Sequence, residues 1–164
     1  MTTQASWLDE IVVVNESTEE RRPGDVSIYR SVGDACEALE YWWVRNGEGY
    51  AFTASGVRLV FAAEPKGPAT IARREDCPEG PAIVLSWLQS LAETALEARK
   101  RVAQNGQAIL SEAEEHGALP ATIEGLIAYI GLPWVVPRNW FVPGCVALLA
   151  TIALLLAAVL IKLF

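Results

Sequence analysis

The sequence predicts an α+β fold: a small antiparallel β-rich unit with one helix, followed by three amphipathic helices and a single C-terminal transmembrane helix. Three observations lead to this prediction. Apolar and polar residues alternate in short runs over residues 25–73, and turn-forming glycines separate these runs. Apolar residues recur at helical spacing over residues 81–130. Residues 142–161 contain no charged side chain.

These patterns divide the chain of 164 residues into four parts. In chain order we expect an N-terminal segment, an α+β domain, an interfacial collar and a membrane anchor, at residues 1–24, 25–131, 132–141 and 142–164. The N-terminal segment leaves two alternatives open, because its only apolar run is Ile11–Val14. Either this run forms a short strand or the whole segment is loose.

Strands and turns are predicted through the first half of the domain. Asp25–Tyr29 alternates in polarity and is expected to be a strand. Within residues 42–61, Asn46–Gly47 and Ser55–Gly56 are typical of tight turns, because glycine tolerates positive φ. This stretch predicts a hairpin, or a three-stranded meander that begins at its first residue. Ala69–Arg73 is expected to add a further strand.

The helix of this first half is expected to begin at Ser31. Ser31 resembles a helix N-cap, because Asp34 follows it at close to the capping-box spacing. The helix then runs to about Glu40 and places four side chains on its buried face: Val32, Ala35, Cys36 and Leu39.

Three further helices are expected in the second half, at residues 81–104, 107–116 and 121–130. Pro81 suits the first position of a helix, and Gly117 and Gly131 are expected to end the second and third helices. In the second helix we expect Ile109, Leu110 and Ala113 to be buried.

The membrane anchor is predicted from length and composition. At 1.5 Å per residue, a helix over residues 142–161 is about 30 Å long, which matches the hydrocarbon core of a bilayer. Aromatic and basic side chains flank this stretch, as is typical of membrane interfaces. We expect the interface to be contacted by Trp134, Arg138, Trp140 and Phe141 on the near side and by Lys162, which snorkels, on the far side.

The orientation is predicted from the other end of the chain and from the cysteines. The N-terminal residues have no basic region followed by a long apolar run, as a signal peptide would. The three cysteines, Cys36, Cys77 and Cys145, are odd in number and form no CxxC pair, which favours a reducing compartment. We therefore expect a single-pass, tail-anchored protein with its N-terminal domain in the cytosol.

Charge makes nucleic acid an unsuitable partner. Eleven of the thirteen Lys and Arg residues precede Arg138, and they are outnumbered by all twenty Asp and Glu residues. Because nucleic-acid affinity comes mainly from cations that neutralise phosphates, this acidic domain is not expected to bind DNA or RNA.

The sequence predicts no catalytic, cofactor-binding or metal-binding residues. It has no glycine-rich phosphate loop, and its cysteines and single histidine lack metal-ligand spacing. His116 could act as a general base with Cys36 as nucleophile, but a polar residue at a helix C-terminus is the favoured interpretation. The adjacent acidic pairs are interpreted as solvated surface charge, at residues 9–10, 19–20, 75–76 and 114–115.

Two features bear on contacts with other proteins. Trp42 and Trp43 point in opposite directions if they lie on a strand, which leaves two alternatives: the late helices cover both, or one of them is exposed as a partner-binding anchor. In the predicted anchor, small residues share one helical stripe that could support self-association: Ala147, Ala150, Thr151 and Ala157.

Three functional hypotheses follow. The leading one is a non-enzymatic, membrane-tethered module that binds a protein partner, as an adaptor or inhibitor does. The alternatives are a membrane-tethered enzyme that uses Cys36 or a carboxylate, and a membrane effector that self-assembles through its anchor.

Overall fold

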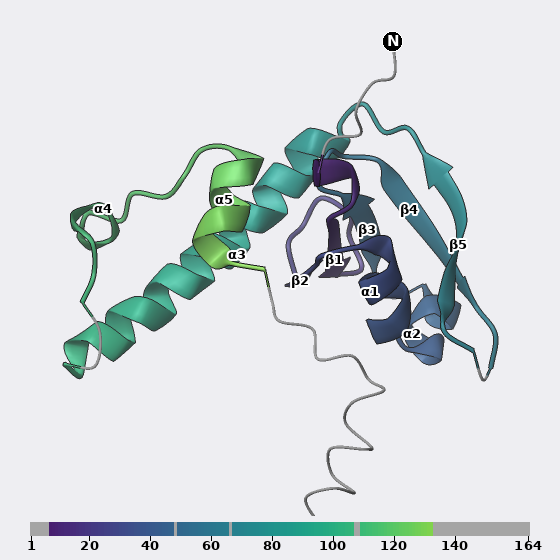
Figure 1. Cartoon of the computed structure of the whole chain (residues 1–164), viewed down its shortest axis with the longest axis horizontal. Helices are drawn as coiled ribbons and strands as arrows, with labels where there is room; N and C mark the ends of the chain where they lie inside the picture. The colour runs from purple at the N-terminus through teal and green to yellow at the C-terminus, as the bar shows by residue number, and fades with distance from the viewer. Residues whose placement is uncertain (1–6, 48, 66, 107–108, 133–164) are drawn as a thin grey trace, which may run out of the picture. The chain divides into compact units, whose positions relative to one another are not determined.

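The computed structural model describes residues 7–47, 49–65, 67–106 and 109–132 (Figure 1). The predicted anchor and all of the collar beyond Leu132 lie outside the described residues, so their assignment stays a prediction. Within the described residues, no helix has both the length and the apolar character needed to cross a bilayer.

A five-stranded antiparallel sheet forms the centre of the domain, in the order β2-β1-β3-β4-β5. Its strands are β1 (Val12–Glu16), β2 (Asp25–Tyr29), β3 (Tyr50–Thr53), β4 (Arg58–Ala63) and β5 (Ala69–Glu75). Short connections join β1 to β2, β3 to β4 and β4 to β5, and each of these pairs is antiparallel. With its helices, this sheet confirms the α+β class.

Helices cover both faces of the sheet. On one face lie α1 (Val32–Ala38) and α2 (Tyr41–Asn46), and on the other lie α3 (Gly80–Gln104) and α5 (Ile123–Ile130). Two short elements complete the described part, a 3-10 turn at Trp7–Asp9 and α4 (Glu112–Glu115). Figure 1 shows α3 as the longest helix, with α5 lying beside it.

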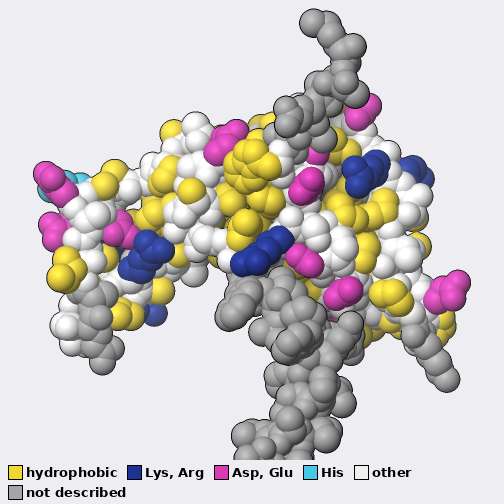
Figure 2. All heavy atoms as spheres, in the orientation of Figure 1, with side chains coloured by type: hydrophobic (Ala, Val, Ile, Leu, Met, Phe, Trp, Pro, Cys, Tyr) yellow, Lys and Arg dark blue, Asp and Glu magenta, His cyan; other side chains and the backbone are white. Residues whose placement is uncertain are grey.

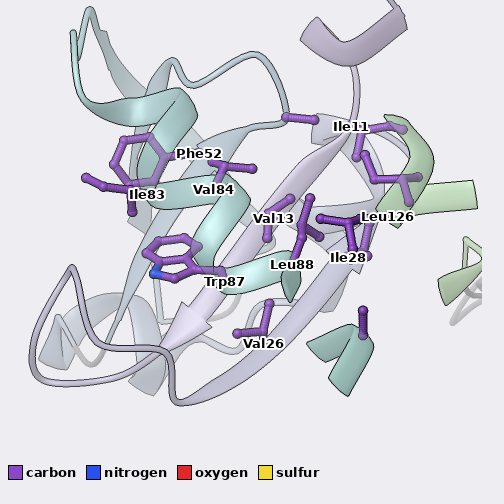
Figure 3. Packing of buried hydrophobic residues seen from close by; sticks show 13 residues of the cluster. Ile11, Val13, Val26, Ile28, Phe52, Ile83, Val84, Trp87, Leu88 and Leu126 are labelled. Carbon is purple, nitrogen blue, oxygen red and sulfur yellow. The ribbon is translucent and has the colours of Figure 1, made fainter. Parts of the chain in front are cut away.

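Two hydrophobic cores result. The first core joins β1, β2 and β3 to α3 and α5, and Trp87 of α3 is its largest fully buried side chain (Figure 3). The second core joins the other face of the sheet to α1 and α2, and it includes Trp43, Leu39 and Leu59.

The strand β1 belongs to both cores. Val13 and the preceding Ile11, just before the strand, enter the first core, whereas Val12 and Val14 enter the second, and all four are buried. A short run of β-branched residues without alternation is typical of a strand buried on both faces. Of the two alternatives for the N-terminal segment, the structure therefore contains the strand.

A buried asparagine at the end of β1 fixes the loop to β2. The side chain of Asn15 is fully buried, and its Nδ2 donates to the carbonyl of Arg22 at 3.0 Å. Its Oδ1 accepts the N–H of Gly24 at 2.7 Å. Trp87 Nε1 holds the same loop from α3 by donating to the carbonyl of Glu20 at 3.0 Å. The loop is thus tied to both the sheet and α3.

Two helix predictions were wrong in part. The stretch from Trp42 forms α2 rather than the first strand of a meander, so the first half contains two helices rather than one. Of the helix expected at 107–116 only α4 is present among the described residues, and Ile109 is 99 % exposed instead of buried. The Ser31 cap is confirmed, since its Oγ accepts the N–H of Asp34 at 3.1 Å.

Candidate functional site

The candidate site lies on α2, which carries both tryptophans predicted to contact a partner. Glu40 precedes the helix, and Gly47 ends it in the left-handed conformation, with φ of 66°. The N–H of Gly47 donates to the carbonyl of Trp43 and closes the last turn. The helix is short, so its stability comes mainly from the side chain that it buries.

That side chain is Trp43, whereas its neighbour points outward. Trp43 is 6 % exposed in the second core, and Trp42 is 50 % exposed. Because successive residues of a helix are about 100° apart, one indole can be buried while the next meets solvent. Of the two alternatives, one tryptophan of the pair is therefore exposed, although both lie on a helix and not on a strand; the role of Trp42 in binding stays a prediction.

Two neighbours enlarge this exposed surface. The Arg45 guanidinium lies 6.0 Å from the centre of the Tyr41 ring, and the Trp42 indole N–H donates to the carboxylate of Glu40. We call Tyr41, Trp42 and Arg45 the α2 surface. The helix fixes their backbone, and the contact with Glu40 orients the Trp42 ring.

A second polar cluster joins the late helices to one another. Arg99 of α3 donates to the carboxylate of Glu114 in α4 at 2.7 Å and to the carbonyl of Tyr129 in α5 at 3.1 Å. The Arg99 guanidinium lies 4.6 Å from the centre of the Tyr129 ring, and the Tyr129 hydroxyl donates to Glu114 at 3.2 Å. These contacts fasten α4 and α5 to α3.

The ionisation of Glu114 depends on this cluster and on a capping box. The backbone N–H of Ser111 donates to the Glu114 carboxylate, and Arg99 and the Ser111 hydroxyl add further donors. Together these donors lower the pKa of Glu114 from 4.5 to about 2. The charged form of Glu114 is therefore favoured by the folded state.

We expect stability between about pH 4.5 and 2 to depend on Glu114. Because its folded pKa lies below the unfolded value, its contribution is present above pH 4.5 and is lost as the pH falls toward about 2. As the pH is lowered through this window, the melting temperature of the Glu114→Gln variant, measured by circular dichroism, should therefore fall less than that of the wild type. The exposed Glu115→Gln variant is a charge-matched control, and equal pH profiles for Glu114→Gln and wild type would contradict the assignment.

The residues weighed for catalysis are not grouped by the structure. Cys36 lies in α1, the helix that contributes Ala35 to the second core, and burial raises the pKa of its thiol. His116 is the C-cap of α4, as the helix-terminus interpretation predicted. Since α4 is fastened to α3 on the other face of the sheet, the two residues belong to different layers. A raised thiol pKa also disfavours the thiolate that a nucleophilic cysteine needs.

The acidic pairs are less solvated than the sequence suggested. Glu20 and Glu75 both approach the Arg58 guanidinium, with Nε–O distances of 3.5 and 3.9 Å. Glu114 belongs to the cluster just described. The capping box could have been predicted from the spacing Ser111-x-x-Glu114. The approach of Glu20 and Glu75 to Arg58 could not, because it depends on the register of the strands. Figure 2 shows acidic and basic side chains interspersed over one face of the molecule.

The remaining predicted site residues lie outside the described residues. These are the interface set Trp134, Arg138, Trp140, Phe141 and Lys162, and the helix-association set Ala147, Ala150, Thr151 and Ala157. Among the described residues, no group of three or more His, Cys, Asp or Glu side chains could hold a metal ion. Comparison with protein-family models, curated proteins and solved structures finds no match to this chain.

Proposed function

We propose that this chain is a single-pass membrane protein that presents its α+β domain, on the cytosolic side, to a protein partner. The anchor would be residues 142–161, whose composition matches a membrane-spanning helix. The partner would dock on the α2 surface. The observation that carries the proposal is the half-exposed indole of Trp42 on a helix rooted in the core by Trp43.

The composition of the α2 surface supports protein binding. Tyr41, Trp42 and Arg45 represent the three residue types most enriched at interface hot spots. An indole that is already oriented loses little conformational freedom on binding, which favours affinity. The surface therefore offers an anchor side chain with a cationic neighbour.

The cysteines support the cytosolic side. Within the part of the chain that the structure describes, Cys36 and Cys77 form no disulfide, and both are partly buried. Free thiols persist in reducing compartments and are commonly oxidised in secreted domains. A domain tethered to the membrane on that side would also meet a membrane-bound partner at raised effective concentration.

The test is capture of the partner by full-length protein extracted in mild detergent. We expect proteins bound by wild type to be bound at least tenfold less by Trp42→Ser, because hot-spot truncation costs about 2 kcal/mol or more. Trp7→Ser is the matched control, since Trp7 is 51 % exposed and lies on another element. Quantitative mass spectrometry of the three captures gives the ratios.

The outcomes distinguish docking on the α2 surface from nonspecific hydrophobic association. Loss in Trp42→Ser with retention in Trp7→Ser supports the α2 surface. Identical captures from wild type and Trp42→Ser would contradict it, as would equal losses in both variants.

A further inference from the structure

Two asparagines of this chain are followed by glycine, and each pair lies at the end of a helix. Asn46–Gly47 ends α2, and Asn105–Gly106 follows the last residue of α3. Both glycines adopt the left-handed conformation, with φ of 66° at Gly47 and 70° at Gly106. A Cβ at either glycine would meet no atom within 4 Å. The two pairs are thus alike in sequence and in the conformation of their glycine.

The backbone nitrogen of such a glycine can react with the preceding side chain, because no side chain of its own hinders it. After losing its proton to hydroxide, this nitrogen forms a bond to Cγ of the asparagine, and the carboxamide nitrogen leaves as ammonia. Water then opens the resulting cyclic succinimide at one of its two carbonyls. The products are aspartate and isoaspartate, in which the main chain passes through the side-chain carbon. The first step requires the two atoms to come into contact, so a backbone held in helical geometry hinders it.

The backbone at Asn46 is held on both sides. Asn46 is the last residue of α2, and the N–H of Gly47 donates to the carbonyl of the buried Trp43. Shortly after it, Gly49 lies so close to the Trp43 ring and to the carbonyl of Asn15 that a Cβ there would overlap both. Rotation of the backbone at Asn46 would break the hydrogen bond to Trp43 and displace the chain that enters β3.

The backbone at Asn105 is restrained only by the last turn of α3. Its N–H donates to the carbonyl of Val102 at 3.2 Å, and the N–H of Gly106 donates to the carbonyl of Ala103 at 2.9 Å. Asn105, Gly106 and Val102 are all exposed, and Figure 1 shows this end of α3 remote from the sheet. The exposed ends of helices open at little cost in free energy. Asn105 can therefore leave helical geometry without disturbing either core.

We infer that Asn105 is a site of spontaneous deamidation, through succinimide formation with Gly106, and that the packing of α2 protects Asn46. The modification replaces an uncharged amide by a carboxylate at the C-terminal end of α3, where the helix dipole disfavours an anion. Isoaspartate also lengthens the main chain between α3 and α4 by one carbon. The domain thereby gains a change of charge and of chain path that accumulates with the age of the protein. This site is separate from the α2 surface and from the predicted anchor.

The test compares the two asparagines within the same molecules. The full chain in phospholipid nanodiscs is incubated in H₂¹⁸O at mildly alkaline pH, so that ring opening introduces ¹⁸O. Digestion with trypsin in ordinary water then separates the sites, because residues 46–58 and 102–138 form two peptides with one asparagine each. Mass spectrometry locates the label and distinguishes aspartate from isoaspartate. We expect Asn105 to acquire label at least about ten times faster than Asn46, which corresponds to about 1.4 kcal/mol of additional opening free energy at Asn46.

Two controls separate the effect of the fold from that of the sequence. In protein unfolded by urea, the two asparagines should react at similar rates, because both are followed by glycine. Asn105→Gln should remove the label from the peptide 102–138 and leave the labelling of the peptide 46–58 unchanged. The inference would be overturned by equal rates in the folded chain, by a faster reaction at Asn46, or by the absence of labelled product at Asn105. A rate ratio that is as large in urea as in the folded chain, or label that persists in the variant, would overturn it as well.

Discussion

Replacing Trp87 by alanine is expected to lower the free energy of unfolding by about 3–5 kcal/mol, a large share of the stability of a single domain. Trp87 is fully buried at the centre of the first core. Its ring meets Phe52 edge to face, with centroids 5.4 Å apart and planes at 71°. Alanine would leave a cavity between α3 and the sheet that the surrounding strands cannot close completely.

Trp87→Phe separates packing from hydrogen bonding. It retains much of the buried ring but removes the N–H that donates to the carbonyl of Glu20. The partly buried carbonyl would lose its donor, and we expect a cost of about 1 kcal/mol. The loop between β1 and β2 should also become more mobile, because it would lose its hydrogen bond to Trp87 of α3 and keep those to Asn15.

Urea unfolding of the full chain in detergent micelles, followed by circular dichroism, measures both costs. Trp42→Ala is the control, because the same residue type at a half-exposed position should cost no more than about 1 kcal/mol. If Trp87→Ala lost no more stability than Trp42→Ala, the assignment of Trp87 as the centre of the first core would be wrong.

The strands were predictable because their pattern is local. Asp25–Tyr29 alternates along its whole length, and the observed β2 has the same bounds. Ala69–Arg73 was recognised in the same way, and β5 extends it by two residues. The strand alternative at Ile11–Val14 could have been chosen from its β-branched run alone. The position of β1 between β2 and β3 could not be predicted from a local pattern, because this order depends on contacts between residues distant in sequence.

The candidate site was predictable in residue type and not in geometry. Trp42, Trp43 and Val44 have strand-forming propensity, yet they form α2 because burial of Trp43 outweighs that weak preference. The identity of the exposed indole follows from the phase of this helix. The close approach of the Gly49 backbone to the Trp43 ring could not be predicted, because it depends on how α2 packs against the sheet.

For the helix predicted at 107–116, a local sequence signal marked the true start of the helix, but the prediction did not use it. Ser111 accepts the N–H of Glu114, and the Glu114 carboxylate accepts the N–H of Ser111. This reciprocal cap requires a helix that begins at Glu112. Ile109 and Leu110 precede the cap, so they do not belong to this helix.

Ending the chain after Pro137 is expected to abolish membrane association, the largest effect on localisation that the proposed function implies. The wild-type chain should remain in the membrane pellet after an alkaline carbonate wash, and the shortened chain should appear in the supernatant. We expect no second means of attachment upstream, because residues 1–137 carry eleven bases against twenty acids and should be weakly repelled by anionic lipids.

A variant of full length separates membrane insertion from loss of sequence. Leu149→Arg combined with Leu155→Arg places two cations near the middle of the predicted span, at about 2.5–3.5 kcal/mol each. We expect this variant to behave like the shortened chain, whereas Leu163→Arg, beyond Lys162, should remain in the pellet. Retention of the double variant in the pellet would show that residues 142–161 do not span the bilayer.

The side on which the domain lies is tested by adding protease to intact cells. With the domain in the cytosol, the protease should cleave it only after the membrane is permeabilised. The same placement requires Cys36 and Cys77 to remain reduced, so both should react with a maleimide in the unfolded protein without prior reduction. Cleavage in intact cells would place the domain outside the cell and contradict its docking to a cytosolic partner. It would not contradict the prediction that residues 142–161 anchor the chain in the membrane. The two halves of the proposal, attachment and orientation, therefore fail independently.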